Sequence, residues 1–285
     1  MDRLLFGDNQ FFGVNHMSEE KARAQAMRFR DTGSVMEVLD AALDEGIRTF
    51  MCTTHERIGE VCEHMRANPA RYRDYVFYPC MPYAHKYNNA VAELGMLGAL
   101  RKFLSNGILD TAVQGGLAFA TKDIERVMKL LIDAEMKMFE GLNTPVVFLQ
   151  NVVVDFLMGL GFKDAFRVFA EHVAARYGAE PGFITMNLPR LLDLLDEVGV
   201  DNPIVCANIN KIEFRMCGGR EAYERAIATR RFRPIAMSVF ASGALAPREA
   251  LEYVCAQKGI KSIVFGASSR SNIRSTRQLV QELDS

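Results

Sequence analysis

The sequence of 285 residues contains no tryptophan, no CxxC pair and no excess of charge of either sign. Its 34 basic and 35 acidic side chains give a formal net charge of -1, so electrostatics give no reason to expect nucleic acid or an anionic membrane as a partner. The six cysteines, at positions 52, 62, 80, 206, 217 and 255, have the spacing of neither a disulfide framework nor a zinc ribbon. These absences favour a reducing compartment.

Long hydrophobic runs are also absent. The nearest to one is the stretch 141–162, which Gln150, Asn151 and Asp155 interrupt, so a buried strand followed by a loop is expected there rather than a membrane span. The first residues, MDRLLFGDNQ, carry acid and amide groups where a secretory signal peptide needs an unbroken apolar core. We therefore expect a soluble, cytoplasmic protein.

Short, almost wholly apolar runs alternate with longer stretches of helical periodicity along the chain. Such runs are typical of parallel strands that are buried on both faces. Strands are predicted at 3–7, 47–53, 75–80, 146–151, 183–187, 204–208, 234–240 and 260–266. Glycines at positions 46, 178, 199 and 259 lie where the intervening helices should end.

Eight strands with intervening helices predict a (β/α)8 barrel, formed as a single domain by residues 1–285. A doubly wound open sheet is the alternative, but no GxGxxG follows the first strand, where the sequence reads FGDNQ. The connection between the third and fourth strands is enlarged, and residues 89–140 are predicted to form a helical insertion.

Polar side chains gather where the predicted strands end. In a (β/α)8 barrel, catalytic and binding residues come from these ends and from the loops that follow them. The positions here are rich in amides, hydroxyls and histidines: Asp8, Asn9, Gln10, His16, His55, His85, Lys86, Gln150, Asn151, Asn187, Lys211, Glu213, Ser238 and Ser242. This ring of polar groups indicates a functional site, although solvated loops are often polar without one.

The segment 266–274, GASSRSNIR, has the pattern of a strand end, a small-residue turn and the start of a helix. Backbone N–H groups at a helix N-terminus, two hydroxyls and two arginines together would form a phosphate cradle. The residues of this predicted cradle are Gly266, Ser268, Ser269, Arg270 and Arg274. A small-molecule ligand with a phosphate group is therefore expected, the alternative being an ordinary serine N-cap followed by surface arginines.

Several ordered segments resemble the aldo-keto reductases. ITMNLPRLL at 184–192 is similar to the family's GVSNF strand and helix, and INKIEF at 209–214 to its VNQIEY segment. PIAMS at 234–238 is similar to PVIAYSPLGRGLL, and IVFGASS at 263–269 to IIPGAS. The resemblance implies a (β/α)8 barrel of aldo-keto reductase type, oxidoreductase chemistry and NADP(H) as the cofactor. It adds Asn187 and Ser238 to the expected cofactor contacts.

The resemblance does not extend to the family's catalytic residues. Those reductases use an Asp and a Tyr after strand two, a Lys on strand three and a His ending strand four, with the tyrosine as proton donor. Here the aspartate position falls at Met51 or Cys52, and no tyrosine is in register. Strand three reads YPC at 78–80 where the lysine is expected, and strand four ends in Gln150 and Asn151 where the histidine is expected. An enzyme on this scaffold would therefore need new acid–base groups.

Four residues are the first candidates for those groups. His55 follows strand two, where a general acid or base would reach a substrate, although it is equally well placed to cap the next helix. His16 lies in the first loop. Lys211 replaces a neutral amide of the family, and Glu213, two residues on, is a candidate partner for its charge.

Two other classes of function stay open. A non-catalytic barrel that binds a nucleotide or a phosphorylated metabolite would also lack the family's catalytic residues. A metal-dependent hydrolase or lyase would need loop ligands to converge, such as Asp8, His16, His55, His85 and Glu213. No HxH, HxxxH or Cys/His spacing supports that reading, so no metal site is expected. A homo-oligomer, formed through residues 89–140, is compatible with the sequence.

Overall fold

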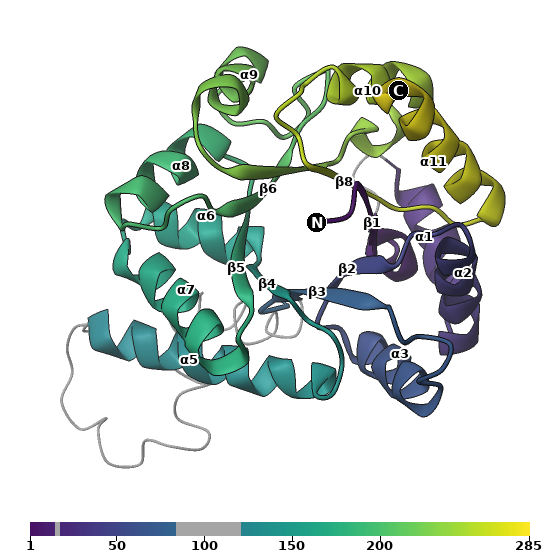
Figure 1. Ribbon diagram of the computed structural model, residues 1–285, viewed down its shortest axis with the longest axis horizontal. Coiled ribbons are helices and arrows are strands. Elements are labelled where there is room, and N and C mark those ends of the chain that lie inside the picture. Colours follow the sequence, from purple (N-terminus) through teal and green to yellow (C-terminus); the bar gives the residue numbers. More distant parts are fainter. Residues whose placement is uncertain (15–17, 84–120) are drawn as a thin grey trace.

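The computed structural model describes residues 1–14, 18–83 and 121–285. Eight parallel strands close into a barrel in the order of the sequence, and helices surround it (Figure 1). The predicted (β/α)8 barrel is confirmed, and the open doubly wound sheet is wrong. The strands are β1 (Leu4–Gly7), β2 (Thr49–Thr53), β3 (Val76–Met81), β4 (Val146–Leu149), β5 (Glu180–Thr185), β6 (Ile204–Asn208), β7 (Arg233–Met237) and β8 (Ser262–Phe265).

Helices and short 3-10 turns connect the strands. The α-helices are α1 (Glu19–Arg28), α2 (Thr32–Asp44), α3 (Glu56–Ala67), α5 (Thr121–Met136), α6 (Asn151–Gly159), α7 (Asp164–Tyr177), α8 (Leu188–Glu197), α9 (Arg220–Thr229), α10 (Pro247–Cys255) and α11 (Arg270–Asp284). The 3-10 turns are η1 (Asn9–Phe12), η3 (Lys137–Phe139) and η4 (Ala241–Gly243). Of the segment 89–140, α5 and η3 belong to the described residues, and 89–120 lies outside them.

Side chains of each strand alternate between the inside of the barrel and the layer under the helices, because successive residues of a strand point to opposite faces. Phe6, Phe50 and Phe77 belong to the outer layer, where they pack against helices. A separate inner cluster fills the barrel, and it contains Leu5, Met51, Tyr78, Cys80, Val146, Phe148, Ile184, Ile204, Cys206 and Ile235. The near-continuous apolar character of the strands therefore reflects burial on both faces.

Most of the helices that the sequence predicts to end at a glycine do end close to it. Gly178 follows α7 with a φ of 62°, the left-handed conformation that glycine adopts without a Cβ clash. Gly259 has a different role, because a Cβ at this position would lie 2.7 Å from Cγ2 of Ile227. The fourth strand differs from its prediction, since β4 ends at Leu149 and α6 begins directly after Gln150 instead of a loop.

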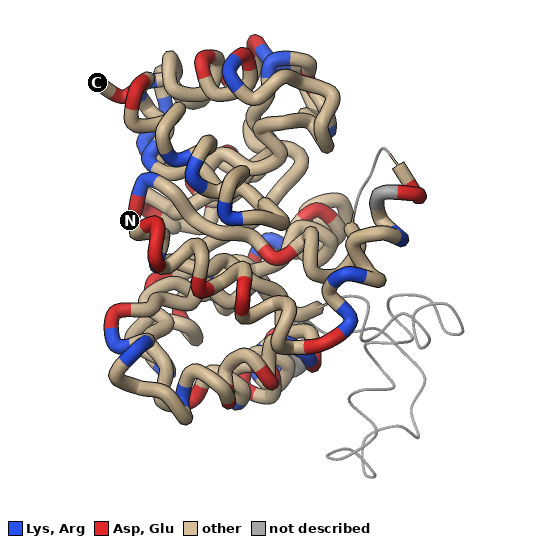
Figure 2. Tube along the Cα trace, turned by 90° about the vertical axis from the view of Figure 1, so that its right-hand side faces the viewer, with Lys and Arg blue, Asp and Glu red and all other residues tan. Residues whose placement is uncertain are grey.

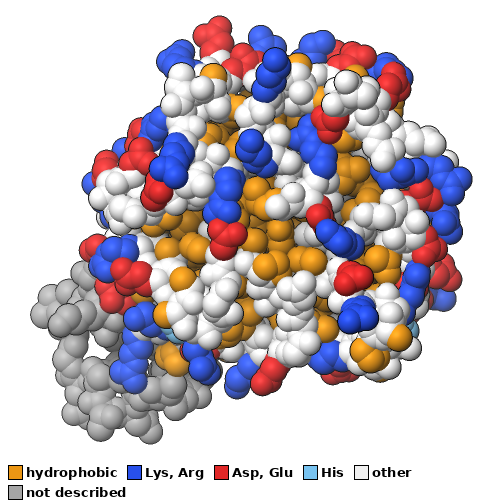
Figure 3. Space-filling model, viewed as in Figure 1, with side chains coloured by type: hydrophobic (Ala, Val, Ile, Leu, Met, Phe, Trp, Pro, Cys, Tyr) orange, Lys and Arg blue, Asp and Glu red, His pale blue; other side chains and the backbone are white. Residues whose placement is uncertain are grey.

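Basic and acidic residues alternate along the described chain (Figure 2). On the face shown in Figure 3, charged side chains surround hydrophobic ones that lie over the middle of the barrel. Within the described ranges, no helix has the length and apolar character needed to cross a membrane. The apolar stretch 141–162, which came nearest to a membrane span in the sequence, folds as strand β4 followed by helix α6.

Candidate active site

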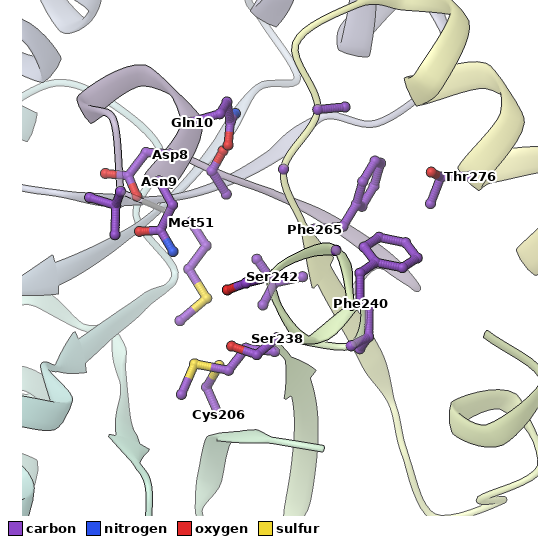
Figure 4. A pocket seen from close by; sticks show the side chains of 18 of the residues that line it. Asp8, Asn9, Gln10, Met51, Cys206, Ser238, Phe240, Ser242, Phe265 and Thr276 are labelled. Carbon is purple, nitrogen blue, oxygen red and sulfur yellow. The ribbon is translucent and has the colours of Figure 1, made fainter. Parts of the chain in front are cut away.

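A cavity of about 670 Å³ opens at the carboxyl ends of the strands and continues along α11. Its floor consists of inward-facing residues of the strands, and its outer limb lies between the loop after β7, the end of β8 and α11 (Figure 4). Floor residues are Met51, Cys80, Ile184, Cys206, Met237 and Val264. Because all eight strands, or the residues directly after them, contribute to the lining, this is the site position expected of a barrel.

The cavity is almost without charge. Among the described residues that line it there is no lysine, arginine or histidine, and Asp8 is the one carboxylate. The thiols of Cys80 and Cys206 are the other titratable groups of the lining, and burial raises the pKa of both. The remaining polar groups are amides and hydroxyls. Proton chemistry by the described lining residues therefore centres on Asp8.

Asp8 lies directly after β1 and is 6% exposed. Gly7 pairs with Met51 across the sheet, which places Asp8 beside the end of β2. There the Oδ2 atom of Asp8 accepts hydrogen bonds from the backbone N–H of Thr53, at 2.7 Å, and from its hydroxyl, at 2.6 Å. Burial nevertheless outweighs these bonds and raises the pKa of the Asp8 carboxyl above its ordinary value.

His55 lies outside the cavity lining. It is the N-cap of α3, and its Nδ1 accepts a hydrogen bond of 3.0 Å from the backbone N–H of Arg57. Its ring stacks on Phe12, with 4.1 Å between the centroids, and makes an edge contact with Tyr83. Of the two roles that the sequence allowed for His55, the structure shows the helix cap.

Lys211 and Glu213 also lie outside the lining, and the pair anticipated between them is replaced by other partners. Nζ of Lys211 lies 2.7 Å from Oε1 of Glu249 on α10. Glu213 has a φ of 60°, and its Oε1 accepts a hydrogen bond from the backbone N–H of Arg220 at the start of α9. The reason is that β6 ends at Asn208, so the strand alternation used to place both side chains on one face does not apply.

Three further sequence candidates, His16, His85 and Lys86, fall outside the described residues. The proposed metal ligands are thus reduced to Asp8, His55 and Glu213, of which Asp8 alone lines the cavity. No group of three His, Cys, Asp or Glu side chains in the described part of the chain is arranged to hold a metal ion.

The predicted phosphate cradle is only partly assembled. Gly266 lines the cavity, whereas Ser269 caps α11 by accepting a hydrogen bond of 3.3 Å from the N–H of Asn272, and Ser268 lies outside the lining. Arg270 and Arg274 bind carboxylates at the end of α2: Nε of Arg270 is 3.2 Å, and Nη2 of Arg274 2.8 Å, from Oε1 of Glu45. For these side chains the structure matches the alternative, a serine N-cap followed by surface arginines.

The two contacts implied by the family resemblance have different outcomes. Asn187 is the N-cap of α8, where its side chain accepts a hydrogen bond of 3.4 Å from the N–H of Arg190, and it does not line the cavity. Ser238 does line it, in the loop after β7.

That loop turns sharply back on itself. Ser238, Ala241 and Ser242 have φ values of 54°, 46° and 57°, and Gly243 has a φ of 91°. Left-handed backbone is uncommon for residues other than glycine, and successive turns of this kind form concave surfaces of N–H groups that suit anions. The predicted strand 234–240 therefore ends early, at Met237, because the backbone turns at Ser238.

The sequence marks Asp8, Asn9, Gln10, Gln150 and Asn151 as polar strand ends, but Asp8 was considered only as a possible metal ligand, and none of the five was given an acid–base role. The available signal for Asp8 was its place directly after a buried strand. For Cys80 and Cys206 it was strand alternation, which puts both thiols in the inner cluster. The α11 residues of the lining, Asn272, Ser275, Thr276 and Leu279, carried no comparable signal.

No protein-family model and no curated protein matches the sequence. Solved structures match it along almost its whole length. A Pseudomonas aeruginosa protein assigned to the aldo-keto reductases has 15% sequence identity and a TM-score of 0.61, with 99% of this chain and 90% of that chain covered. Gox0644 in its apo form has 10% identity and a TM-score of 0.54, with 100% and 89% covered.

A protein assigned as a 2,5-diketo-D-gluconic acid reductase B has 9% identity and a TM-score of 0.54, with 99% of this chain and 86% of that chain covered. At such identities the likeness shows the fold and does not carry over an activity. The chain has the (β/α)8 barrel fold of the aldo-keto reductases, as the sequence motifs predicted.

Proposed function

We propose that this chain is an oxidoreductase of the aldo-keto reductase kind, which reduces the carbonyl group of a small molecule in the barrel cavity and uses Asp8 as the proton donor. The observation that carries the proposal is the position of Asp8: it is the one carboxyl group of the described lining, and its pKa is raised. A proton donor is most effective when its pKa lies near the working pH, and burial moves a carboxyl in that direction.

A nicotinamide dinucleotide is the cofactor that such a reaction requires, and the cavity has features that fit one. The Oε1 atoms of Gln10 and Gln25 are buried and have no hydrogen-bond partner among the described residues, and both side chains line the cavity. The hydroxyl and amino groups of a dinucleotide can supply donors to these acceptors. The volume of about 670 Å³ is also within the usual range for ligand pockets.

The residues that would hold such a cofactor are largely neutral. The diphosphate would accept hydrogen bonds from the loop after β7, through its backbone N–H groups and the hydroxyls of Ser238 and Ser242. Asn272 would donate a further hydrogen bond from α11. The end of β8 can lie close to Gln10 because residue 266 is a glycine: a Cβ there would lie 2.0 Å from Oε1 of Gln10. When bound in its reduced form, the nicotinamide supplies a hydride to the carbonyl carbon.

The chain itself supplies the proton. Thr53 donates both of its hydrogen bonds to Oδ2 of Asp8, so the protonated carboxyl carries its proton on Oδ1. Transfer of this proton to the carbonyl oxygen completes the alcohol and leaves an Asp8 carboxylate. The two donors of Thr53 stabilise the carboxylate until it takes up a proton from water. The amides of Asn9, Gln150 and Asn151 also line the cavity and are available to orient the substrate.

The test is a comparison of two aspartate variants. Asp155 on α6 also accepts hydrogen bonds from a threonine hydroxyl and a backbone N–H, on Oδ1 from Thr185 at 2.5 Å and on Oδ2 from Met186 at 3.0 Å, and burial also raises its pKa. Unlike Asp8, it does not line the cavity. With NADH or NADPH and a panel of aldehydes and ketones, Asp8→Asn should lower kcat by about 10²-fold or more, while Asp155→Asn should leave kcat nearly unchanged. Equal effects of the two substitutions would contradict the proposal.

A non-catalytic barrel remains the second candidate, because the family's own catalytic residues are absent. It predicts saturable dinucleotide binding with no turnover of any carbonyl compound in the panel. Both candidates predict binding in a titration followed by the fluorescence of the reduced cofactor, so the turnover assay with the carbonyl panel separates them.

A further inference from the structure

Helix α11 presents two chemically different faces. Asn272, Thr276 and Leu279 line the cavity, together with Ser275, whereas Arg270, Arg274 and Arg277 bind Glu45. At about 3.6 residues per turn, positions 270, 274 and 277 fall on one stripe of the helix, and 272, 276 and 279 fall on a stripe roughly opposite. The three arginines of α11 are thus directed toward Glu45 at the end of α2, and the residues on the opposite stripe are directed toward the cavity.

Glu45 holds the cationic stripe in place. Its side chain is only 6% exposed, and its Oε1 lies 3.2 Å from Nε of Arg270 and 2.8 Å from Nη2 of Arg274. Its Oε2 lies 3.4 Å from Nη2 of Arg277, and Asp44 adds a contact of 3.4 Å to Arg270. The hydrogen bond from Arg274 lowers the pKa of the Glu45 carboxyl, so it stays ionised and keeps its partners near neutral pH.

NADP(H) differs from NAD(H) by one phosphate monoester, which carries a charge of roughly -1.5 to -2 at neutral pH. The described cavity lining offers this group no cation, and recruiting Arg270 or Arg274 would break their ion pairs with Glu45. A phosphate dianion that is removed from water without a cationic partner is unfavourable. The hydroxyl that NAD(H) has at the same position suits the amide and hydroxyl groups of α11.

On the basis of the proposed function, we infer that the cavity selects NAD(H) over NADP(H), and that Glu45 is the positioning residue that sets this selectivity. Arg270 and Arg274 do not contact the dinucleotide; they are held on the α2 side of α11. The preference is therefore determined by a carboxylate that never touches the cofactor.

The test is direct titration of the full chain with NADH and with NADPH, following the emission of the reduced cofactor. The wild-type Kd for NADH should be lower than that for NADPH by about tenfold or more. Glu45→Gln, which frees the arginines, should lower the Kd for NADPH by about fivefold and change that for NADH by less than about twofold. A purely structural role for Glu45 would move both constants together.

Arg270→Ala and Arg274→Ala are the matched controls, and they keep the test informative if Glu45→Gln does not fold. Neither should change the Kd for NADPH by more than about twofold in the wild-type background. Tighter wild-type binding of NADPH than of NADH, weakened by Arg270→Ala, would overturn the inference and leave the proposed function standing. No saturable binding of either cofactor up to millimolar concentration would overturn the proposed function, and with it this inference.

Discussion

Thr53 donates two hydrogen bonds to a single oxygen of Asp8, one from its backbone N–H at 2.7 Å and one from its hydroxyl at 2.6 Å. Asp8 directly follows β1 and Thr53 is the last residue of β2, so their contact joins the two neighbouring strands at the rim of the cavity. It fixes the orientation of a buried carboxyl whose pKa is nevertheless raised, because desolvation outweighs the two bonds. This raised pKa is the basis for the proposed role of Asp8 as the proton donor.

The pH dependence of turnover follows from that balance. A proton donor must be protonated, so kcat/KM should be highest below the pKa of Asp8 and fall as the pH rises through it. Because burial raises this pKa, the fall should be centred above 3.8, the ordinary value for an aspartate. A pH–rate profile of the wild type should show this limb, and the residual activity of Asp8→Asn should lack it. The same limb in both proteins would exclude Asp8 as the donor.

Gly266 and Gln10 should be coupled in stability. A Cβ at 266 would lie 2.0 Å from Oε1 and 2.9 Å from Cδ of Gln10, whose Nε2 donates a hydrogen bond of 2.8 Å to the carbonyl oxygen of Gly7. Gly266→Ala should therefore lower the free energy of unfolding by about 1–2 kcal/mol, through overpacking and loss of that bond.

Gln10→Ala removes the obstructing amide. In urea unfolding, Gly266→Ala should therefore lower the free energy of unfolding less in the Gln10→Ala background than in the wild type. Gly59→Ala is the control. Gly59 lies within α3 with nothing near its Cβ position, so this change should stabilise the chain by about 0.5–1 kcal/mol through helix propensity. Equal losses for Gly266→Ala with and without Gln10 would contradict the close contact.

His55 should affect stability more than catalysis. Its Nδ1 caps the first turn of α3, and its ring stacks on Phe12. His55→Ala should lower the free energy of unfolding by about 1 kcal/mol, while His55→Asn, which keeps a capping side chain, should lower it less. Turnover per folded molecule should change by less than about twofold. A loss of kcat comparable to that of Asp8→Asn would show that His55 takes part in catalysis and would contradict this prediction.

The cysteines should divide into two groups by reactivity. Cys217 is exposed, whereas Cys80 and Cys206 are buried in the cavity floor, and desolvation raises the pKa of both buried thiols. The thiolate is the reactive form, so a thiol-specific chromogenic reagent should modify Cys217 first, and Cys217→Ser should remove that fast phase. Occupation of the cavity should slow modification of Cys80 and Cys206 further. Fast labelling of either in the native protein would contradict their burial.

The barrel could be predicted from the amino-acid pattern alone. Eight apolar runs, each short enough for a strand and separated by helical periodicity, allow burial on both faces only when the strands lie side by side under a layer of helices. The same patterns located the polar rim, because residues that directly follow buried strands, such as Asp8 and Gln150, meet at one end of a barrel. The motifs shared with aldo-keto reductases depend on this local order as well.

The partners of the polar residues, in contrast, could not be predicted before the fold was known. Lys211 and Glu213 were expected to face each other, but β6 had already ended, and each found a partner on a different helix. Arg270 was expected to bind phosphate, yet its partner Glu45 lies 225 positions away in the chain. Desolvation by the closed barrel raises the pKa of Asp8, whereas the hydrogen bonds from Thr53 of the neighbouring strand act to lower it. Ion pairing and desolvation are set by distance in space, so local sequence patterns carry no record of them.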